Sequence, residues 1–194
     1  MEKLSLKDEK SLLRSQFREK RKLYATEQGP DALRALHANI QKWKRDNPIG
    51  SDQLCAYRAV GEEADPCVQP LTEMFFPRID GKTLAFYRPL TADAFSANKY
   101  GILEPSPDAA EPFQPKKPAI VFTPAIAVDS LGRRIGSGLG FYDHFFQGSP
   151  SAVRVGVVFH IQVSQNPLPA EGWDQLLDWI ITDKMILRVS RRSS

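Results

Sequence analysis

One short segment of the chain, residues 129–143, combines residue types that bind phosphate. Three glycines alternate in it at Gly136, Gly138 and Gly140, with arginines before them and an acid after them. Because glycine lacks a Cβ atom, alternating glycines let successive backbone N–H groups turn inward and form a concave anion site. Arginine side chains add charge-assisted hydrogen bonds to phosphate oxygens. The segment therefore predicts a site for the phosphates of a nucleotide.

The charged and aromatic residues of this segment are Arg133, Arg134, Phe141, Tyr142 and Asp143. We expect Asp143 to hold a divalent cation beside the phosphates, because Mg²⁺ prefers oxygen ligands. The two aromatic rings would form a wall for a second ligand. These residue types alone do not exclude simpler structural roles. The glycines could form a tight turn, the acid could cap a helix, and the aromatic side chains could pack in the core.

The order of these residues differs from that of two widespread phosphate-binding motifs. The P-loop ends in Gly-Lys-Ser/Thr, and the dinucleotide motif Gly-x-Gly-x-x-Gly directly follows a strand. The segment instead resembles the signature of the 5-formyltetrahydrofolate cyclo-ligase (methenyltetrahydrofolate synthetase) family, Phe-Asp-x-x-Gly-x-Arg-Leu-Gly-x-Gly-x-Gly-Tyr-Tyr-Asp. The chain matches it at Asp129, Gly132, Arg134, Gly136, Gly138, Gly140, Tyr142 and Asp143. It departs from it, by apolar or aromatic replacements, at Val128, Ile135 and Phe141.

Shorter matches to the same family extend over most of the chain. The Lys-x-x-x-Arg of the family's first helix corresponds to Lys10 and Arg14, and its Gly-Ile-x-Glu-Pro string corresponds to residues 101–105. Its later Gln, Leu-Pro, Asp and Ile-Thr correspond to Gln162, Leu168-Pro169, Asp174 and Ile181-Thr182. The order and spacing of these matches carry the resemblance, since none of them is specific alone.

The resemblance implies an ATP site and a magnesium site. ATP would contact Lys10, Arg14, Arg134 and the loop that follows, namely Ile135, Gly136, Ser137, Gly138, Leu139, Gly140, Phe141 and Tyr142. Mg²⁺, the implied cofactor, would be held by Asp143 and Asp174. Arg134 and Tyr142 would position the reactants, and the implied reaction needs no side-chain nucleophile.

A folate site is implied as well. The family has a Glu-x-Asp-Thr string that opens a helix, and its Glu contacts the folate. The equivalent string here begins at Glu63 and has Pro66 where Thr is usual, and Glu62 is a close competitor for the role. Phe141 and Tyr142 would line the folate pocket. The spacing of the sequence indicates that the helix after this string is shorter than is usual for the family.

The implied activity is the ATP- and Mg²⁺-dependent cyclisation of 5-formyltetrahydrofolate to 5,10-methenyltetrahydrofolate, with release of ADP and phosphate. Phosphorylation of the formyl oxygen would give an iminium phosphate that N10 attacks.

Two other functions stay open. A divergent relative, indicated by the changes at Pro66, Ser137 and Leu139, would bind folate or nucleotide without closing the ring. A nucleic-acid-binding protein would use the basic first helix and Arg191-Arg192, but no known RNA- or DNA-binding pattern accompanies that charge, so no nucleic acid is expected.

The composition bounds the class of protein. The 194 residues suit one domain, and 42% hydrophobic with 25% charged residues is ordinary for a globular protein. No apolar run of about 18 residues and no apolar leader occurs, so we expect a cytoplasmic protein with no membrane partner. The sequence does not determine the oligomeric state, and a monomer is the working expectation. Cys55 and Cys67 match no metal-binding spacing and are expected to be reduced thiols.

Positive charge is concentrated at the start of the chain. Residues 1–24 carry eight lysines and arginines against four acids, while the rest of the chain has a net charge of −1. Lys10, Arg14 and Arg18 recur every four residues, so they form one cationic row on a helix predicted over residues 7–24. Such a row either binds a polyanion or only faces solvent, and the charge pattern alone does not decide between the two.

Strands that alternate with helices predict an α/β fold, a three-layer α/β/α sandwich around a central, mostly parallel sheet, in one domain over residues 1–194. The basic first helix would pack on this domain, the chain would break at Gly29-Pro30-Asp31, and a second helix would run to Arg45. Expected strands cover 54–57, 74–76, 84–87, 119–123, 153–159 and 186–189, and a short helix begins at Tyr142. The remaining expectations are a short element at 66–74, an irregular loop at 104–118, and a change from helix to strand over 176–181.

Overall fold

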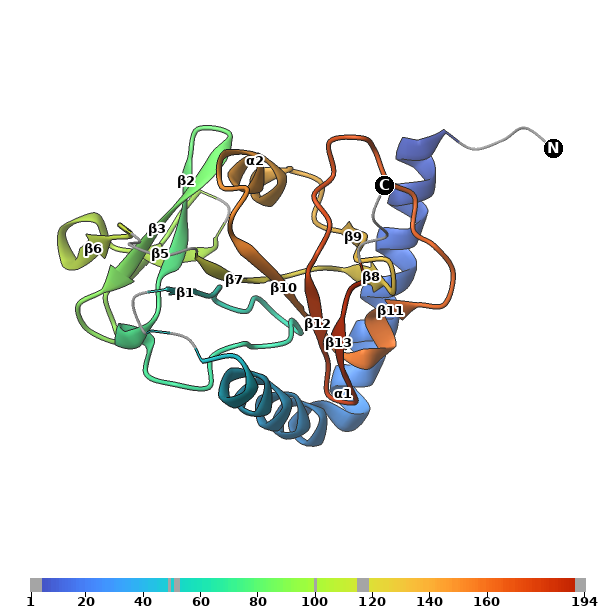
Figure 1. Cartoon of the computed structure of the whole chain (residues 1–194), viewed down its shortest axis with the longest axis horizontal. Coiled ribbons are helices and arrows are strands. Elements are labelled where there is room, and N and C mark those ends of the chain that lie inside the picture. The colour runs from blue at the N-terminus through green and yellow to red at the C-terminus, as the bar shows by residue number, and fades with distance from the viewer. Residues whose placement is uncertain (1–4, 49, 51–52, 100, 115–118, 191–194) are drawn as a thin grey trace.

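The centre of the molecule is a five-stranded sheet in the order β1-β7-β10-β12-β13 (Figure 1). The computed structural model describes residues 5–48, 50, 53–99, 101–114 and 119–190. The five strands are β1 (Leu54–Cys55), β7 (Ile120–Thr123), β10 (Val153–Val157), β12 (Trp179–Ile181) and β13 (Ile186–Arg188). The first four run parallel, and β13 pairs antiparallel with β12. The predicted mostly parallel central sheet is confirmed.

Helices cover both faces of this sheet (Figure 1). The two helices are α1 (Leu6–Asp46) and α2 (Phe141–Gly148). Leu36 and Trp43 of α1 pack against Phe122 on one face, whereas Phe146 of α2 packs with Val121 on the other. Neighbouring residues of a strand point to opposite faces of the sheet, so Phe122 packs in the core under α1 and Val121 packs in the core under α2. The three-layer α/β/α arrangement predicted from the sequence is therefore present.

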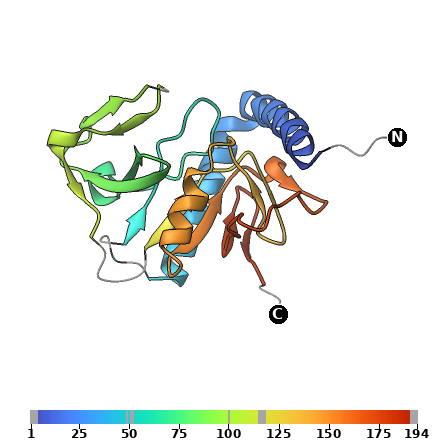
Figure 2. The same cartoon turned by 90° about the horizontal axis from the view of Figure 1, so that it is seen from above.

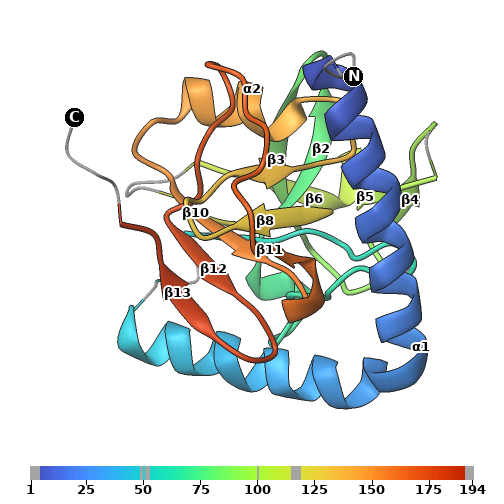
Figure 3. The ribbon, with the colours of Figure 1, turned by 90° about the vertical axis from the view of Figure 1, so that its right-hand side faces the viewer.

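The predicted break between two N-terminal helices is wrong, because α1 runs without interruption from Leu6 to Asp46 and contains Pro30. Figure 3 shows that α1 instead changes direction near its middle, the region that holds Pro30. Proline lacks an N–H donor and crowds the preceding turn, which bends a helix without ending it. The bend gives α1 two arms: the C-terminal arm covers the sheet, and the N-terminal arm packs through Phe17 against Ile126 and Ala127.

Although α1 is long, it is too polar to cross a membrane, and no other described helix has the length and apolar character to do so.

A small second sheet, in the order β11-β8-β9, carries the glycine-rich segment. Its strands are β8 (Ala127–Asp129), β9 (Arg134–Ile135) and β11 (Val163–Ser164). β8 and β9 form an antiparallel pair, and Ile135 of β9 is buried with Phe17 of α1 and Leu168. The N-terminal arm of α1 is thereby fixed beside the start of the glycine loop.

The strands between residues 76 and 112 form a separate group at one side of the central sheet, drawn in green in Figures 1 and 2. One sheet has the order β2-β3-β6, with β2 (Phe76–Asp80), β3 (Thr83–Pro89) and β6 (Ala110–Pro112), and a two-stranded sheet pairs β4 (Phe95–Ala97) with β5 (Leu103–Pro105). The expectation of an irregular loop over 104–118 is thus wrong for residues 104–112, which hold β5, a 3₁₀ turn and β6. Residues 115–118 of that loop lie outside the described residues.

Two further predictions have different outcomes. The short element expected over 66–74 is present as a 3₁₀ turn at Leu71–Glu73. Pro70, directly before it, has no N–H to donate to a longer helix. The predicted helix at the start of 176–181 is absent, since the Leu177 N–H donates to the carbonyl of Gly132 and the Asp178 N–H to the carbonyl of Arg154. The backbone donors that a helix would use are therefore committed to other segments.

Gly132 offers a test of how tightly this segment is fixed. Its φ is +80°, and an added Cβ would lie 2.7 Å from the carbonyl oxygen of Leu177. We expect Gly132→Ala to lower the free energy of unfolding by roughly 1–3 kcal/mol, measured by urea titration. The control is Gly148→Ala, where an added Cβ meets nothing within 4 Å, and it should shift that free energy by less than about 0.5 kcal/mol. Equal stabilities of the two variants would contradict this packing.

Candidate functional site

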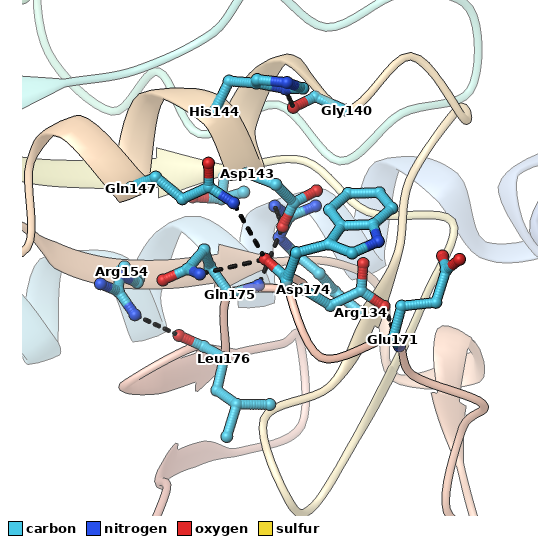
Figure 4. Close-up of polar contacts among 12 residues, drawn as sticks. Arg134, Gly140, Asp143, His144, Gln147, Arg154, Glu171, Asp174, Gln175 and Leu176 are labelled. Atoms are coloured by element: carbon cyan, nitrogen blue, oxygen red, sulfur yellow. Dashed lines mark hydrogen bonds and ion pairs between the residues drawn. The ribbon is translucent and has the colours of Figure 1, made fainter.

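The candidate site is assembled from four segments that are distant in the sequence. They are the N-terminal arm of α1, the loop around Glu63, the glycine-rich segment 129–143 and the turn at 171–175. Lys10 of α1 contacts the turn, Arg14 contacts the glycine loop, and Arg21 approaches Glu63. Asp143 accepts a hydrogen bond from the backbone N–H of Gln175, which joins the turn to α2 (Figure 4). The residues predicted for ATP, metal and folate therefore lie around one region.

The first ion pair of the site involves Lys10, which is 8% exposed. Its Nζ donates to Oδ2 of Asp174 at 2.7 Å and to Oε2 of Glu171 at 2.8 Å. Burial lowers the pKa of Lys10, but the hydrogen bonds to Asp174 and Glu171 outweigh it, so the net shift of the pKa is upward. The ammonium group is therefore held in its charged form.

The second ion pair joins Arg134 to Asp143 (Figure 4). Nη2 of Arg134 lies 2.7 Å from Oδ1 of Asp143, and the two side chains are only 6% and 9% exposed. The guanidinium group also lies 6.0 Å from the ring centre of Tyr142. Within the described part of the chain, the buried Nε of Arg134 has no hydrogen-bond partner. A buried donor of this kind is what an anionic ligand would satisfy.

These two pairs share a pattern: each combines a predicted phosphate-binding cation with a predicted metal-binding carboxylate. The hydrogen bonds described for Asp143 all fall on Oδ1, and those of Asp174 all fall on Oδ2. One oxygen of each carboxylate is thus left for a cation, which fits Mg²⁺ because it usually binds one or two carboxylates together with waters and phosphate oxygens. Among the residues that the structure describes, no three His, Cys, Asp or Glu side chains form a metal cluster, so a protein-only cage is absent there.

The glycine loop lies against Arg14. Nε of Arg14 donates to the carbonyl of Gly136 at 2.9 Å, and a Cβ added to Gly138 would lie 3.4 Å from the same guanidinium group. Gly138 and Gly140 have φ of +104° and +71°, which strongly favours glycine at both positions. Ser137 and Leu139 between them are exposed. The loop therefore presents backbone, as the sequence predicted, with one cationic side chain beside it.

Two predicted ATP contacts are placed differently from the rest. The side chain of Ile135 is 2% exposed in the core, so only its backbone faces the site. Phe141 is half-buried and packs toward the core of α2 and the sheet. Both side chains therefore have a packing role here, which is the simpler role left open for the aromatic residue.

Asp129 is a site residue whose role the sequence analysis did not identify. It is 1% exposed and accepts hydrogen bonds from the N–H groups of Leu131, Arg133 and Leu168. These bonds close the turn that enters the glycine segment and tie it to the chain at Leu168. The signal that would have predicted this anchor is an aspartate followed three residues later by a glycine, which is typical of a turn closed by the aspartate side chain.

Of the two predicted folate carboxylates, Glu63 is more buried than Glu62. Oε2 of Glu63 accepts a hydrogen bond from the N–H of Val60, and Oε1 lies 3.8 Å from Nη1 of Arg21. Glu62 is exposed, whereas the side chain of Glu63 is 27% exposed. Burial raises the pKa of Glu63, against the opposing effects of the Val60 hydrogen bond and the charges of Arg21 and Arg18. Glu63 is thus the carboxylate directed into the protein.

Tyr142 lies beside the arginine of the second ion pair. Burial raises the pKa of its hydroxyl, the charge of Glu63 raises it further, and the charge of Arg134 lowers it. Of these two charged residues, Arg134 has a described contact with the ring, with its guanidinium group 6.0 Å from the ring centre.

The cationic row of α1 faces the protein at most of its length. Lys10 and Arg14 make the contacts described above, and Arg21, which the sequence analysis did not single out, continues the row to Glu63. Arg18 is exposed, but its charge still acts on Glu63. A row that only faces solvent is thereby excluded, and the helical spacing after Arg14 is the signal that would have found Arg21.

Known proteins resemble this chain over nearly its whole length. The model of the 5-formyltetrahydrofolate cyclo-ligase family matches residues 6–183. The 5-formyltetrahydrofolate cyclo-ligase of Haemophilus influenzae is 33% identical over 111 residues, which cover 56% of this chain and only 54% of that relative. The protein of the same name from Mycolicibacterium smegmatis is 27% identical over 170 residues, 80% of this chain and 86% of the relative.

Solved structures show the same similarity. The NMR structure of Aquifex aeolicus 5,10-methenyltetrahydrofolate synthetase superposes with a TM-score of 0.71 at 25% identity, covering 95% of both chains. A 5,10-methenyltetrahydrofolate synthetase from Mycoplasma pneumoniae gives a TM-score of 0.66 at 18% identity, over 90% of this chain and 98% of the other. The second match supports the fold alone, and both agree with the predicted fold class.

The raised pKa of Glu63 predicts a pH-dependent effect of Glu63→Gln on the melting temperature. The carboxyl ionises near 4.5 in the unfolded chain and at higher pH in the folded one, so its ionisation destabilises the fold as pH rises through this range. Glu63→Gln removes that effect, because the amide stays neutral. At pH 7 the variant should therefore melt at a higher temperature than the original protein, and the difference should vanish below about pH 4.

Glu62→Gln is the matched control, since its side chain is exposed, and it should leave the melting temperature unchanged at both pH values. A lower melting temperature of Glu63→Gln at pH 7 would mean that the carboxylate is stabilised by Arg21 more than it is penalised by burial.

Proposed function

The chain belongs to the 5-formyltetrahydrofolate cyclo-ligase family, and we propose that it converts 5-formyltetrahydrofolate to 5,10-methenyltetrahydrofolate with ATP and Mg²⁺, releasing ADP and phosphate. The observation that carries the proposal is the pairing of Lys10 with Asp174 and of Arg134 with Asp143 around the glycine loop. This arrangement supplies cations for a phosphate chain and carboxylates for its metal ion within one site.

The phosphates of ATP would bind the cations of the site and the backbone of the loop. Lys10, Arg14 and Arg134 provide the positive charge, and the N–H groups between Gly136 and Gly140 provide neutral donors. A phosphate oxygen would take the place of a carboxylate oxygen on Lys10 or Arg134, and the freed carboxylate would then be available to hold the metal ion. Mg²⁺, held by Asp143 and Asp174, would neutralise the charge on the phosphates.

The reaction needs a phosphoryl group and a formyl group held close together. The formyl oxygen would attack the γ-phosphorus and break its bond to ADP, giving an iminium phosphate. N10 would then attack the formyl carbon, the C–O bond would break to release phosphate, and N10 would lose its proton. Arg134 would position the phosphoryl group, and its contacts with Asp143 and Tyr142 support this role.

The folate would lie between Tyr142 and Glu63. The Glu63 carboxylate would accept hydrogen bonds from ring N–H donors of the pterin, and Tyr142 would pack against the ring. Burial raises the pKa of Glu63. A ligand that donates hydrogen bonds to this carboxylate, without displacing a charged neighbour from it, would stabilise the ionised form of Glu63. These roles are supported by the partial burial of Glu63 and by the contact of Tyr142 with Arg134.

A second candidate function is a relative that binds the ligands without turnover. It is favoured by the folate side, where Pro66 and the single 3₁₀ turn at Leu71–Glu73 replace the helix that the resemblance implied. Nucleic-acid binding has less support, because the cationic row contacts the protein itself. Arg191 and Arg192, which it would also use, lie outside the described residues.

The deciding experiment is a spectrophotometric assay with purified protein, 5-formyltetrahydrofolate, ATP and Mg²⁺. We expect the near-ultraviolet band of the methenyl product to grow only when both ATP and Mg²⁺ are present. Lys10→Ala should raise the KM for ATP roughly tenfold or more, the effect of losing a charged hydrogen bond, with a smaller change in the KM for the folate. Lys22→Ala removes the same charge from an exposed position of α1 and should leave both constants unchanged.

The two candidate functions separate clearly in this assay. Absence of the methenyl band, in a protein whose melting temperature rises with ATP or the folate, would refute the cyclo-ligase and support a binding protein. Equal effects of Lys10→Ala and Lys22→Ala on the KM for ATP would remove Lys10 from the site.

A further inference from the structure

Trp173 is an exposed aromatic residue that the proposed reaction does not use. The chain has three tryptophans. Trp43 is 2% exposed, and Trp179 packs edge-on against it with ring centres 5.8 Å apart. Trp173 is 45% exposed. A partly exposed tryptophan offers a flat apolar face to a ligand, and the neighbours of Trp173 show which ligand could reach it.

The indole of Trp173 lies at the end of the glycine loop, next to Lys10. Nζ of Lys10 is 5.7 Å from the centre of the ring. A Cβ added to Gly140 would lie 3.9 Å from Cζ3 of Trp173 and 3.4 Å from Nδ1 of His144. The exposed ring therefore borders both a predicted phosphate-binding lysine and the last glycine of the predicted phosphate loop.

The backbone around Trp173 is held in place by hydrogen bonds. The Asp174 N–H donates to the carbonyl of Glu171, and the carboxylate of Asp174 accepts from the Glu171 N–H. The carbonyl of Trp173 accepts from Nε2 of Gln175 at 3.0 Å and from Nε2 of Gln147 at 3.5 Å (Figure 4). A ligand that stacks on the ring would therefore have to order only the side chain, and not the backbone that carries it.

The row of cations on α1 shows which part of the nucleotide would reach Trp173. Lys10 and Arg21 are eleven residues apart on one helix arm, roughly 16 Å along its axis. Trp173 lies at the Lys10 end, and Glu63 lies at the Arg21 end. In the proposed reaction the γ-phosphate must point toward the folate, near Glu63 and Tyr142. The base, at the other end of the nucleotide, is then directed toward the Lys10 end.

From this placement, and resting on the proposed function, we propose that Trp173 stacks against the purine base of the nucleotide. A flat indole contacts the face of a base and does not read its hydrogen-bonding edge. Such a contact adds affinity for a nucleotide over an inorganic polyphosphate, which offers the same charges without a base. Trp173 is thus the residue that makes the site selective for nucleotides.

The test compares ADP with inorganic tripolyphosphate, both with Mg²⁺, by calorimetric titration of the original protein and two variants. Trp173→Ala should weaken ADP binding on the order of tenfold, the usual effect of losing one stacked base, and should change tripolyphosphate binding by less than about twofold. Trp173→Phe keeps an aromatic face and is the matched control, so its affinity for ADP should stay within about threefold of the original.

Tryptophan fluorescence gives a second measurement that does not need the alanine variant to fold. ADP should quench the emission of the original protein more than tripolyphosphate does, and Trp173→Phe should abolish the quenching because Trp43 is buried and Trp179 packs against the same core cluster.

Three results would overturn the inference. They are an equal loss of affinity for both ligands in Trp173→Ala, no loss for either, and a weakened affinity for the folate in place of ADP. If the original protein bound neither ADP nor tripolyphosphate, the proposed function would fail and the inference with it.

Discussion

The site depends on the pairing of buried positive and negative charges. Lys10 with Asp174 and Arg134 with Asp143 are largely removed from water, and each charge is compensated by its partner. Removing one member of such a pair leaves an uncompensated buried charge, which is strongly destabilising. The two pairs also join α1, the glycine-rich segment and the turn at 171–175, so the same contacts that neutralise the site hold its parts together.

This arrangement has a consequence for binding. Phosphates alone would displace the carboxylates from Lys10 and Arg134 and leave negative groups close to one another. In the proposed function, phosphates that arrive with Mg²⁺ would replace one charge-balanced arrangement by another, since the cations would bind phosphate and the freed carboxylates would bind the metal ion. We therefore expect the affinity for the phosphates to depend on the metal ion, through Asp143 and Asp174.

The sequence predicted those features that depend on local pattern. The apolar run at 119–123 and the alternating glycines before α2 are local, and both lie where they were expected. The ion pairs were not predicted as pairs, because Lys10 and Asp174 meet only through the fold. The predicted break at Pro30 became a bend, since packing of both arms of α1 outweighs the loss of one backbone hydrogen bond. The predicted helix before β12 failed because Leu177 donates to a distant carbonyl, that of Gly132.

The most direct test of the paired charges is the affinity of Asp174→Asn for ATP, measured by calorimetry with EDTA and again with Mg²⁺. In EDTA the variant should bind ATP several-fold more tightly than the original protein. The phosphates no longer have to displace the Asp174 carboxylate from Lys10, and the neutral asparagine does not repel them. With Mg²⁺ the order should reverse, because a metal ligand is lost. A variant that binds ATP more weakly than the original protein under both conditions would contradict the exchange of partners on which this account of the site rests.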